Sequence, residues 1–160
     1  MEITLLASLF SGGIVGMPMV PLLTDNYLRP FPLISQSRAE RLEEMLIQGM
    51  NRGMKGDYAG AIAVFSQLIK RHPRYVEAYF NRGIAYGRMG QTQAAIADYS
   101  QVIRLAPHYA EAYHERGLLW QKLGKSKAAQ QDFQQAARLY QAQGNQFGYQ
   151  SLGPFLFKQP

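Results

Sequence analysis

The hydrophobic and small residues of this chain recur at an interval of 34 residues. The positions that keep this interval are the aromatic residues Phe65, Tyr99 and Phe133, the alanines Ala61, Ala95 and Ala129, and the glycines Gly49, Gly83 and Gly117. The stretch 75–90 also returns, nearly unchanged, as 109–124. A period of this length held over three copies is typical of a repeat array.

Each copy is predicted to be a pair of helices that turns at a glycine. The first helices are expected over about 38–54, 75–88 and 109–122, and the second helices over about 58–71, 92–105 and 126–143. Gly56, Gly90 and Gly124 stand at the turns, where a left-handed residue closes a helix. Thr92 and Ser126 are predicted to cap the helices that follow these turns.

The ends of the array are predicted from local signals. Ser37-Arg-Ala-Glu40 has the spacing of a capping box, so the first helix is expected to start at Arg38. A proline, Pro73 or Pro107, ends the second helix of each of the first two copies. Gln141 stands where the third copy would have its proline, so the last long helix is expected to continue until Gly144.

The repeated residues are predicted to serve packing. The glycines at the period let the two helices of a pair approach closely, with the repeated alanines on the surface opposite. The repeated aromatic residues then fill the space between successive pairs.

These residues resemble the tetratricopeptide repeat, in three copies over about 42–75, 76–109 and 110–143 within residues 37–145. The resemblance implies an all-α fold, a right-handed superhelical array of three helix-turn-helix hairpins. The run 136–149 resembles the closing segment of tetratricopeptide proteins from photosynthetic bacteria.

The resemblance also implies that a concave groove, lined by the first helix of each hairpin, binds a peptide or helix of a protein partner. The predicted groove residues are Glu43, Leu46, Ile47, Met50, Met54, Glu77, Phe80, Asn81, Ile84, Arg88, Glu111, His114, Glu115, Leu118 and Lys122. The end of this groove at the first repeat is rich in apolar residues and methionine, which adapts to varied shapes. The other end is mixed and partly acidic.

One functional subclass of the family uses a clamp of basic and amide side chains to bind the carboxylate tails of Hsp70 and Hsp90. Asn81 alone matches that clamp. Leu46 and Met50 replace its polar residues, and Glu111 and Glu115 stand where basic residues belong. Two acids would repel a carboxylate, so we expect no Hsp70 or Hsp90 tail binding.

Residues 1–36 form an apolar arm and a proline-containing linker. Residues 3–23 hold no charged residue, but Gly12, Gly13, Gly16, Pro18 and Pro21 weaken or break a helix of that length. The arm is predicted to dock on its own repeats, on a partner or on a membrane, with a cleaved signal or disorder as further alternatives. Its candidate contacts are Leu5, Leu6, Leu9 and Phe10.

The chain ends in a short apolar tail, residues 146–160. An exposed run of Phe155, Leu156 and Phe157 would be an unfavourable apolar patch. The tail is therefore expected to pack on the last hairpin or to meet a membrane or partner, with Phe155 and Phe157 as the contacts.

Composition and charge narrow the function further. The 160 residues include no cysteine and carry a formal net charge of +6. The excess gathers in the turns of the repeats rather than along one stripe with stacking aromatic residues, so nucleic-acid binding is not expected. The three histidines lie apart, with no helical partner for a metal, and no catalytic motif is present. We therefore expect no enzyme activity and no cofactor.

The sequence thus predicts a non-catalytic adaptor that binds protein and helps to assemble or stabilise a larger complex, which could be a membrane complex. The alternative is a permanent structural subunit of a membrane complex, held by the apolar arm. If the arm spans a membrane, Arg29, Arg38 and Arg41 favour keeping the repeats on the cytoplasmic side. The sequence leaves the two functions open.

Overall fold

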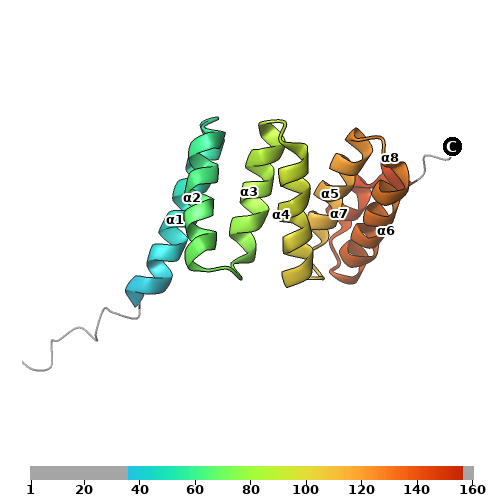
Figure 1. Ribbon diagram of the computed structural model, residues 1–160. Coiled ribbons are helices and arrows are strands. Elements are labelled where there is room, and N and C mark those ends of the chain that lie inside the picture. Colours follow the sequence, from blue (N-terminus) through green and yellow to red (C-terminus); the bar gives the residue numbers. More distant parts are fainter. Residues whose placement is uncertain (1–35, 157–160) are drawn as a thin grey trace, which may run out of the picture. The chain divides into compact units, whose positions relative to one another are not determined.

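Three antiparallel helix pairs stand side by side in chain order (Figure 1). The computed structural model describes residues 36–156. The predictions for residues 1–35, among them Leu5, Leu6, Leu9 and Phe10, and for Phe157 lie outside the described residues.

The first helices of the three hairpins are α1 (Gln36–Met54), α3 (Val76–Arg88) and α5 (Ala110–Lys122). The second helices are α2 (Tyr58–Arg71), α4 (Thr92–Leu105) and α6 (Ser126–Ala142). Two short helices follow, α7 (Gln146–Ser151) and α8 (Gly153–Leu156). The predicted all-α array of three hairpins is confirmed, and most helix boundaries fall within one or two residues of the prediction.

The turns form as predicted, because a residue with positive φ closes each first helix. Gly56, Gly90 and Gly124 have φ values of 82°, 74° and 71°. Gly144 has the same backbone conformation at 67° and ends the longer last helix, as predicted. Side chains other than glycine rarely adopt this conformation, so these glycines are required by the turns.

The predicted helix caps are wrong. α1 begins at Gln36, so Ser37 lies within its first turn instead of preceding it. Thr92 and Ser126 are the first helical residues of α4 and α6, and the cap positions before them make no side-chain capping bond. The residue after each turn glycine donates a backbone hydrogen bond to a carbonyl of the preceding helix. The cap position therefore falls on that residue, which is one position before Thr92 or Ser126.

The repeated glycines make room for the aromatic ring of their own hairpin. A Cβ atom placed on Gly49 would lie 2.4 Å from the Phe65 ring, and one placed on Gly117 would lie 2.7 Å from the Phe133 ring. The close partner of each glycine is therefore the repeated aromatic residue, and not the repeated alanine that the sequence had suggested.

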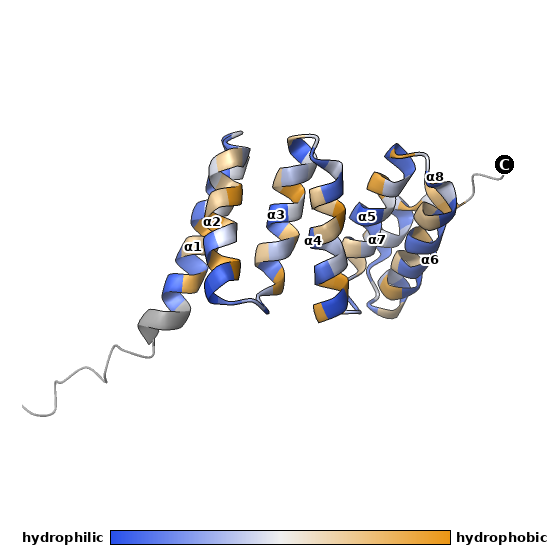
Figure 2. Cartoon of the chain, viewed as in Figure 1, coloured by the Kyte–Doolittle hydropathy of each residue, from blue (hydrophilic) through white to orange (hydrophobic). Residues whose placement is uncertain are grey.

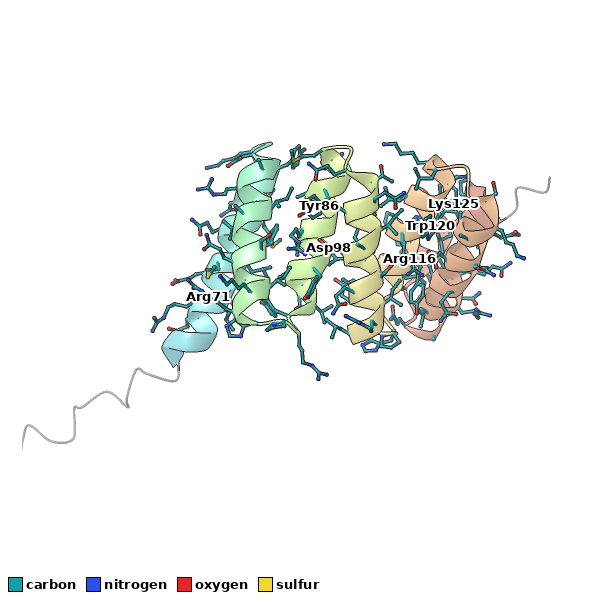
Figure 3. The ribbon with its side chains drawn as sticks, in the orientation of Figure 1. Arg71, Tyr86, Asp98, Arg116, Trp120 and Lys125 are labelled. Atoms are coloured by element: carbon teal, nitrogen blue, oxygen red, sulfur yellow. The ribbon has the colours of Figure 1, made fainter. Side chains whose placement is uncertain are left out.

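A ladder of polar side chains crosses from one hairpin to the next. Arg82 of α3 donates two hydrogen bonds of 2.8 Å to the Asp98 carboxylate of α4 and one of 3.0 Å to the Ser66 hydroxyl of α2. Arg116 repeats this arrangement with Asp132 and Ser100. Asp98 and Arg116 are labelled in Figure 3. Each arginine thus ties its own hairpin to the one before it.

The C-terminal residues close the array. Leu152, between α7 and α8, is fully buried. The Phe155 ring of α8 stacks on Phe133 with 4.7 Å between centroids and an interplanar angle of 23°. The prediction that the tail packs on the last hairpin is confirmed for residues up to 156. Within residues 36–156, no helix is long and apolar enough to span a membrane.

Candidate partner-binding groove

The predicted groove residues occupy one face of each of the three first helices. Each helix supplies five of them, at relative positions that are repeated in α1, α3 and α5. Apolar residues recur along these helices and along the second helices that support them (Figure 2). The structure separates the predicted residues into an open part over the first two hairpins and a covered part over the third.

The open part is an apolar pocket of 410 Å³ between the first hairpin and α3. Five predicted residues line it: Met50, Met54, Asn81, Ile84 and Arg88. The side chains of Met50, Met54 and Ile84 are 43%, 82% and 36% exposed, which is unusual for large apolar residues gathered at one place. The pocket therefore presents apolar surface that a partner can bury.

Residues that the sequence assigned only to packing form the rest of the pocket. They are Gly49, Gly53, Tyr58, Ala61, Phe65 and Ala85. The missing Cβ atom of Gly49 lets the Phe65 ring lie against α1, and this ring is 2% exposed. The 34-residue period marked Phe65 and Ala61 as structural, but the period alone could not indicate that they also border an open pocket. Tyr58 carried no repeat signal.

Three predicted groove residues have other surroundings. Phe80 is half-buried, with ring centroids 5.6 Å from Tyr99 and 5.0 Å from Tyr109, so it belongs to the packing between hairpins. Leu46 packs against the buried cluster of Ala61, Phe65 and Ala85. Ile47 is 54% exposed but lines a separate depression on α1.

The chain's own C-terminal segment covers the groove at the third hairpin. Phe155 lies 6.3 Å from the ring of His114, and Phe155 and Leu118 both pack against the cluster around Phe133 and Tyr140. Burial lowers the pKa of His114, against an opposing effect of Glu111. His114 is therefore a half-buried residue among aromatic rings.

The charged groove residues lie in two groups. Glu43 and Glu77 are exposed two helical turns before Met50 and Ile84, and Arg88 and Lys122 are exposed at the C-terminal ends of α3 and α5. Glu115 is partly buried, and this burial raises its pKa while Arg88 opposes the rise. The Asn81 side chain donates a hydrogen bond of 2.8 Å to the backbone carbonyl of Glu77, which occupies one of its donors within α3.

The described groove residues offer an apolar pocket bordered by exposed charged residues. Among the described residues, no three His, Asp or Glu side chains gather where they could hold a metal ion. Arg88 is the one charged residue among those that line the pocket, and most of the others are apolar or glycine. This geometry suits capture of a segment of another molecule.

Comparison with known families agrees with the helical geometry. Family descriptions of the tetratricopeptide repeat match residues 76–109 and residues 110–143, and a further TPR repeat description matches residues 54–90. The chain belongs to the tetratricopeptide repeat family, whose repeats are non-catalytic protein-interaction modules. A comparison with curated protein sequences finds no match. The resemblance of residues 136–149 to proteins of photosynthetic bacteria stays a prediction.

Several solved structures share the fold. The TPR2B domain of yeast Sti1 in a complex with pHsp70 is 22% identical, with a TM-score of 0.70 over 74% of this chain and 95% of that one. The Yersinia enterocolitica type III secretion translocator chaperone SycD is 18% identical, with a TM-score of 0.70 over 74% of this chain and 82% of that one. The second TPR of Spaghetti (RPAP3), bound to the HSP90 peptide SRMEEVD, is 27% identical, with a TM-score of 0.61 over 66% of this chain and 97% of that one.

Proposed function

We propose that this chain is an adaptor that binds an apolar segment of a protein partner in the pocket between its first hairpin and α3. The observation that carries the proposal is the 410 Å³ apolar pocket with Met50, Met54 and Ile84 exposed at its mouth. Burying apolar surface of this kind is the main favourable contribution to most protein association.

Two further features support the proposal. Methionine side chains are flexible and polarisable, so a pocket bordered by Met50 and Met54 can fit partners of different shape. The third hairpin offers a precedent within the molecule, because the Phe155 ring packs on Phe133 there, whereas Phe65, the equivalent of Phe133 in the first hairpin, borders the open pocket.

The test is a double variant with a single-substitution control. In Met50→Glu/Ile84→Glu, two carboxylates enter the pocket mouth, and the complexes recovered from native lysate should lose the partner. Met89→Glu is the control, because Met89 is 44% exposed but does not line the pocket. A photo-crosslinking residue at position 84 should also attach to the partner, whereas one at position 89 should not.

The adaptor proposal fails if the double variant and the control recover the same partner in equal amounts while both remain helical by circular dichroism. It also fails if position 84 forms no crosslink in a complex that still assembles. Phe80 is unsuitable for this test because its ring packs against Tyr99 and Tyr109, and a charge there would damage the fold.

We also propose that the groove does not bind Hsp70 or Hsp90 tails. Supporting this, Met50 is apolar where a clamp needs a polar residue, and Glu111 and Glu115 present acids on α5. The peptide SRMEEVD, labelled for fluorescence anisotropy, should show no saturable binding to the full chain. Binding in the micromolar range, lost in Arg88→Gln, would contradict this proposal.

We further propose that the protein helps to assemble or stabilise a larger complex. In this role it would lie on the cytoplasmic side, in contact with a membrane. Its support is the uncharged run 3–23 in the sequence. The protein should follow the membrane fraction through a salt wash, and deletion of residues 1–35 should release it. Release by salt alone would contradict membrane contact through this run and would leave the pocket proposal intact. Retention after the deletion would contradict anchoring through this run, both for the adaptor and for the alternative, a permanent structural subunit of a membrane complex held by the apolar arm.

A further inference from the structure

On both α1 and α3, a glutamate lies two helical turns before a pocket residue on the same face of the helix. These glutamates, Glu43 and Glu77, form an acidic edge. Met50 follows Glu43 by seven residues in α1, and Ile84 follows Glu77 by seven residues in α3. Seven residues of helix rise about 10 Å and return to nearly the same face. A segment that reaches from the pocket to the glutamates must therefore bridge about 10 Å, or about three residues of extended chain.

The acidic edge combines carboxylates with aromatic side chains. Tyr75, which precedes α3, is half-buried, and its pKa is raised by burial and then by Glu77 and Glu43. Tyr109 has the same relation to Glu111 and Glu77. Met50 and Ile84 line one pocket, and Glu43 and Glu77 stand two turns earlier on the same faces of α1 and α3, so both glutamates face the end of the groove where Tyr75 precedes α3. The raised pKa of Tyr75 agrees with this placement.

The charge of this face is opposite to that of the whole chain. The formal net charge is +6, yet the predicted groove positions hold four glutamates and two basic residues, Arg88 and Lys122. Arg88 lines the pocket itself, about three helical turns after Glu77 in α3. The apolar pocket therefore contains a basic residue, whereas the glutamates lie at the end of the groove that holds the tyrosines.

We propose that the partner segment carries a large apolar side chain and, three residues away, a lysine or arginine that lies over the edge formed by Glu43, Tyr75 and Glu77. This inference rests on the adaptor function and specifies the chemistry of its partner. A cation at that edge gains two carboxylates and can face a tyrosine ring. An acid at the same place would meet like charge.

Three peptides test the proposal against the full-length protein. Each has ten residues with blocked ends and a single leucine at its centre, and they differ only three residues after the leucine, where they carry Lys, Gln or Glu. Binding is followed by the methyl NMR signals of Met50 and Met54, which detect weak complexes and report on the pocket alone. We expect the Lys peptide to bind about two- to tenfold more tightly than the Gln peptide, and the Glu peptide to bind most weakly. Added salt should reduce the difference.

Variants locate the preference. In Glu43→Gln/Glu77→Gln, the Lys and Gln peptides should bind with equal affinity. Glu44→Gln is the control for a change of charge on α1, because it removes one carboxylate beside a different depression and should leave the preference unchanged. Comparing peptide and protein changes in this way isolates the contact between them.

The outcomes separate this inference from the adaptor function. Equal affinity of all three peptides, with the Met50 signals shifting in each case, would overturn the basic-residue inference and support the apolar pocket. A preference for Lys that survives in Glu43→Gln/Glu77→Gln would also overturn it, since the glutamates would then not be the contact. No change in the Met50 signals with any peptide would overturn this inference, whereas the partner-recovery experiment would still decide the adaptor function.

Discussion

The Arg82 guanidinium and the Asp98 carboxylate face each other through two hydrogen bonds of 2.8 Å, and their side chains are 18% and 7% exposed. Their positions are 16 residues apart in the chain. Arg82 also bonds Ser66 of the preceding hairpin, so one arginine holds three helices together. The same geometry returns at Arg116, Asp132 and Ser100, and the array is therefore joined by a polar ladder as well as by its apolar core.

Breaking the Arg82–Asp98 ion pair should lower the free energy of unfolding much more than breaking an exposed ion pair. Asp98→Asn leaves the partly buried Arg82 without its countercharge, and we expect the free energy of unfolding to fall by about 3 kcal/mol. Chemical denaturation followed by circular dichroism measures the change. The control is Arg52→Gln, which breaks an ion pair with Asp57 whose side chains are 46% and 47% exposed and should cost less than about 1 kcal/mol. Equal losses in the two variants would contradict the structural role of the ladder.

The 34-residue period was enough to predict the helices and their glycine turns, because it reports which positions are equivalent. It did not reveal the ladder, although Ser66, Arg82 and Asp98 each return 34 residues later. Equivalence between copies does not say which positions touch within a copy, and contacts 16 residues apart depend on how α3 and α4 pack. The groove was predicted only in part, for the same reason. The period placed Met50 and Ile84 on the face that lines the pocket. It could not show that Phe80 packs against other rings or that Phe155 lies against His114, because both contacts depend on how the helices pack.

Replacing a glycine at a helix contact with alanine should destabilise the protein, whereas the same change at an open position should not. Gly49→Ala places a methyl group 2.4 Å from the Phe65 ring, and the ring or α1 must move. We expect a loss of about 1–3 kcal/mol, typical of an overpacked core. Gly87→Ala is the control, because a Cβ there meets nothing within 4 Å. Since alanine favours helix, that variant should gain up to about 1 kcal/mol. Thermal unfolding that moves both variants in the same direction would contradict the close-approach role of Gly49.

The buried environment of His114 should make stability depend on pH. Burial lowers the pKa of His114 in the folded state, although Glu111 opposes this shift, and the rings of Phe133, Tyr140 and Phe155 surround it. The unfolded chain therefore binds a proton more readily than the folded one, and stability falls as the pH drops from about 7 through the lowered pKa. Burial raises the pKa of Glu115, so that group adds a slope of opposite sign near and above pH 4.5.

His114→Leu should flatten the loss of stability on the acid side of pH 7, as measured by denaturant midpoints at a series of pH values. His108→Gln is the control, because His108 lies exposed between α4 and α5. If the two variants flatten the profile equally, or if neither does, the slope does not come from the buried histidine. The separate slope from Glu115 can be identified with Glu115→Gln, which should make stability fall less as the pH rises above about 4.5.

In the closing segment, the ring of Phe155 should stabilise the fold, whereas the ring of Phe147 should not. Phe155 stacks on Phe133, so Phe155→Ala removes a packed ring, and we expect a loss of about 2–3 kcal/mol. Phe147, on the adjacent short helix α7, is 85% exposed, and Phe147→Ala should change stability by less than about 0.5 kcal/mol. The loss of Phe155 should also uncover the His114 end of the groove, so the His114 ring protons should shift in Phe155→Ala and remain in place in Phe147→Ala. Equal stability of the two variants would mean that α8 does not close the array, and the groove at the third hairpin would then be open to a partner like the pocket at the first.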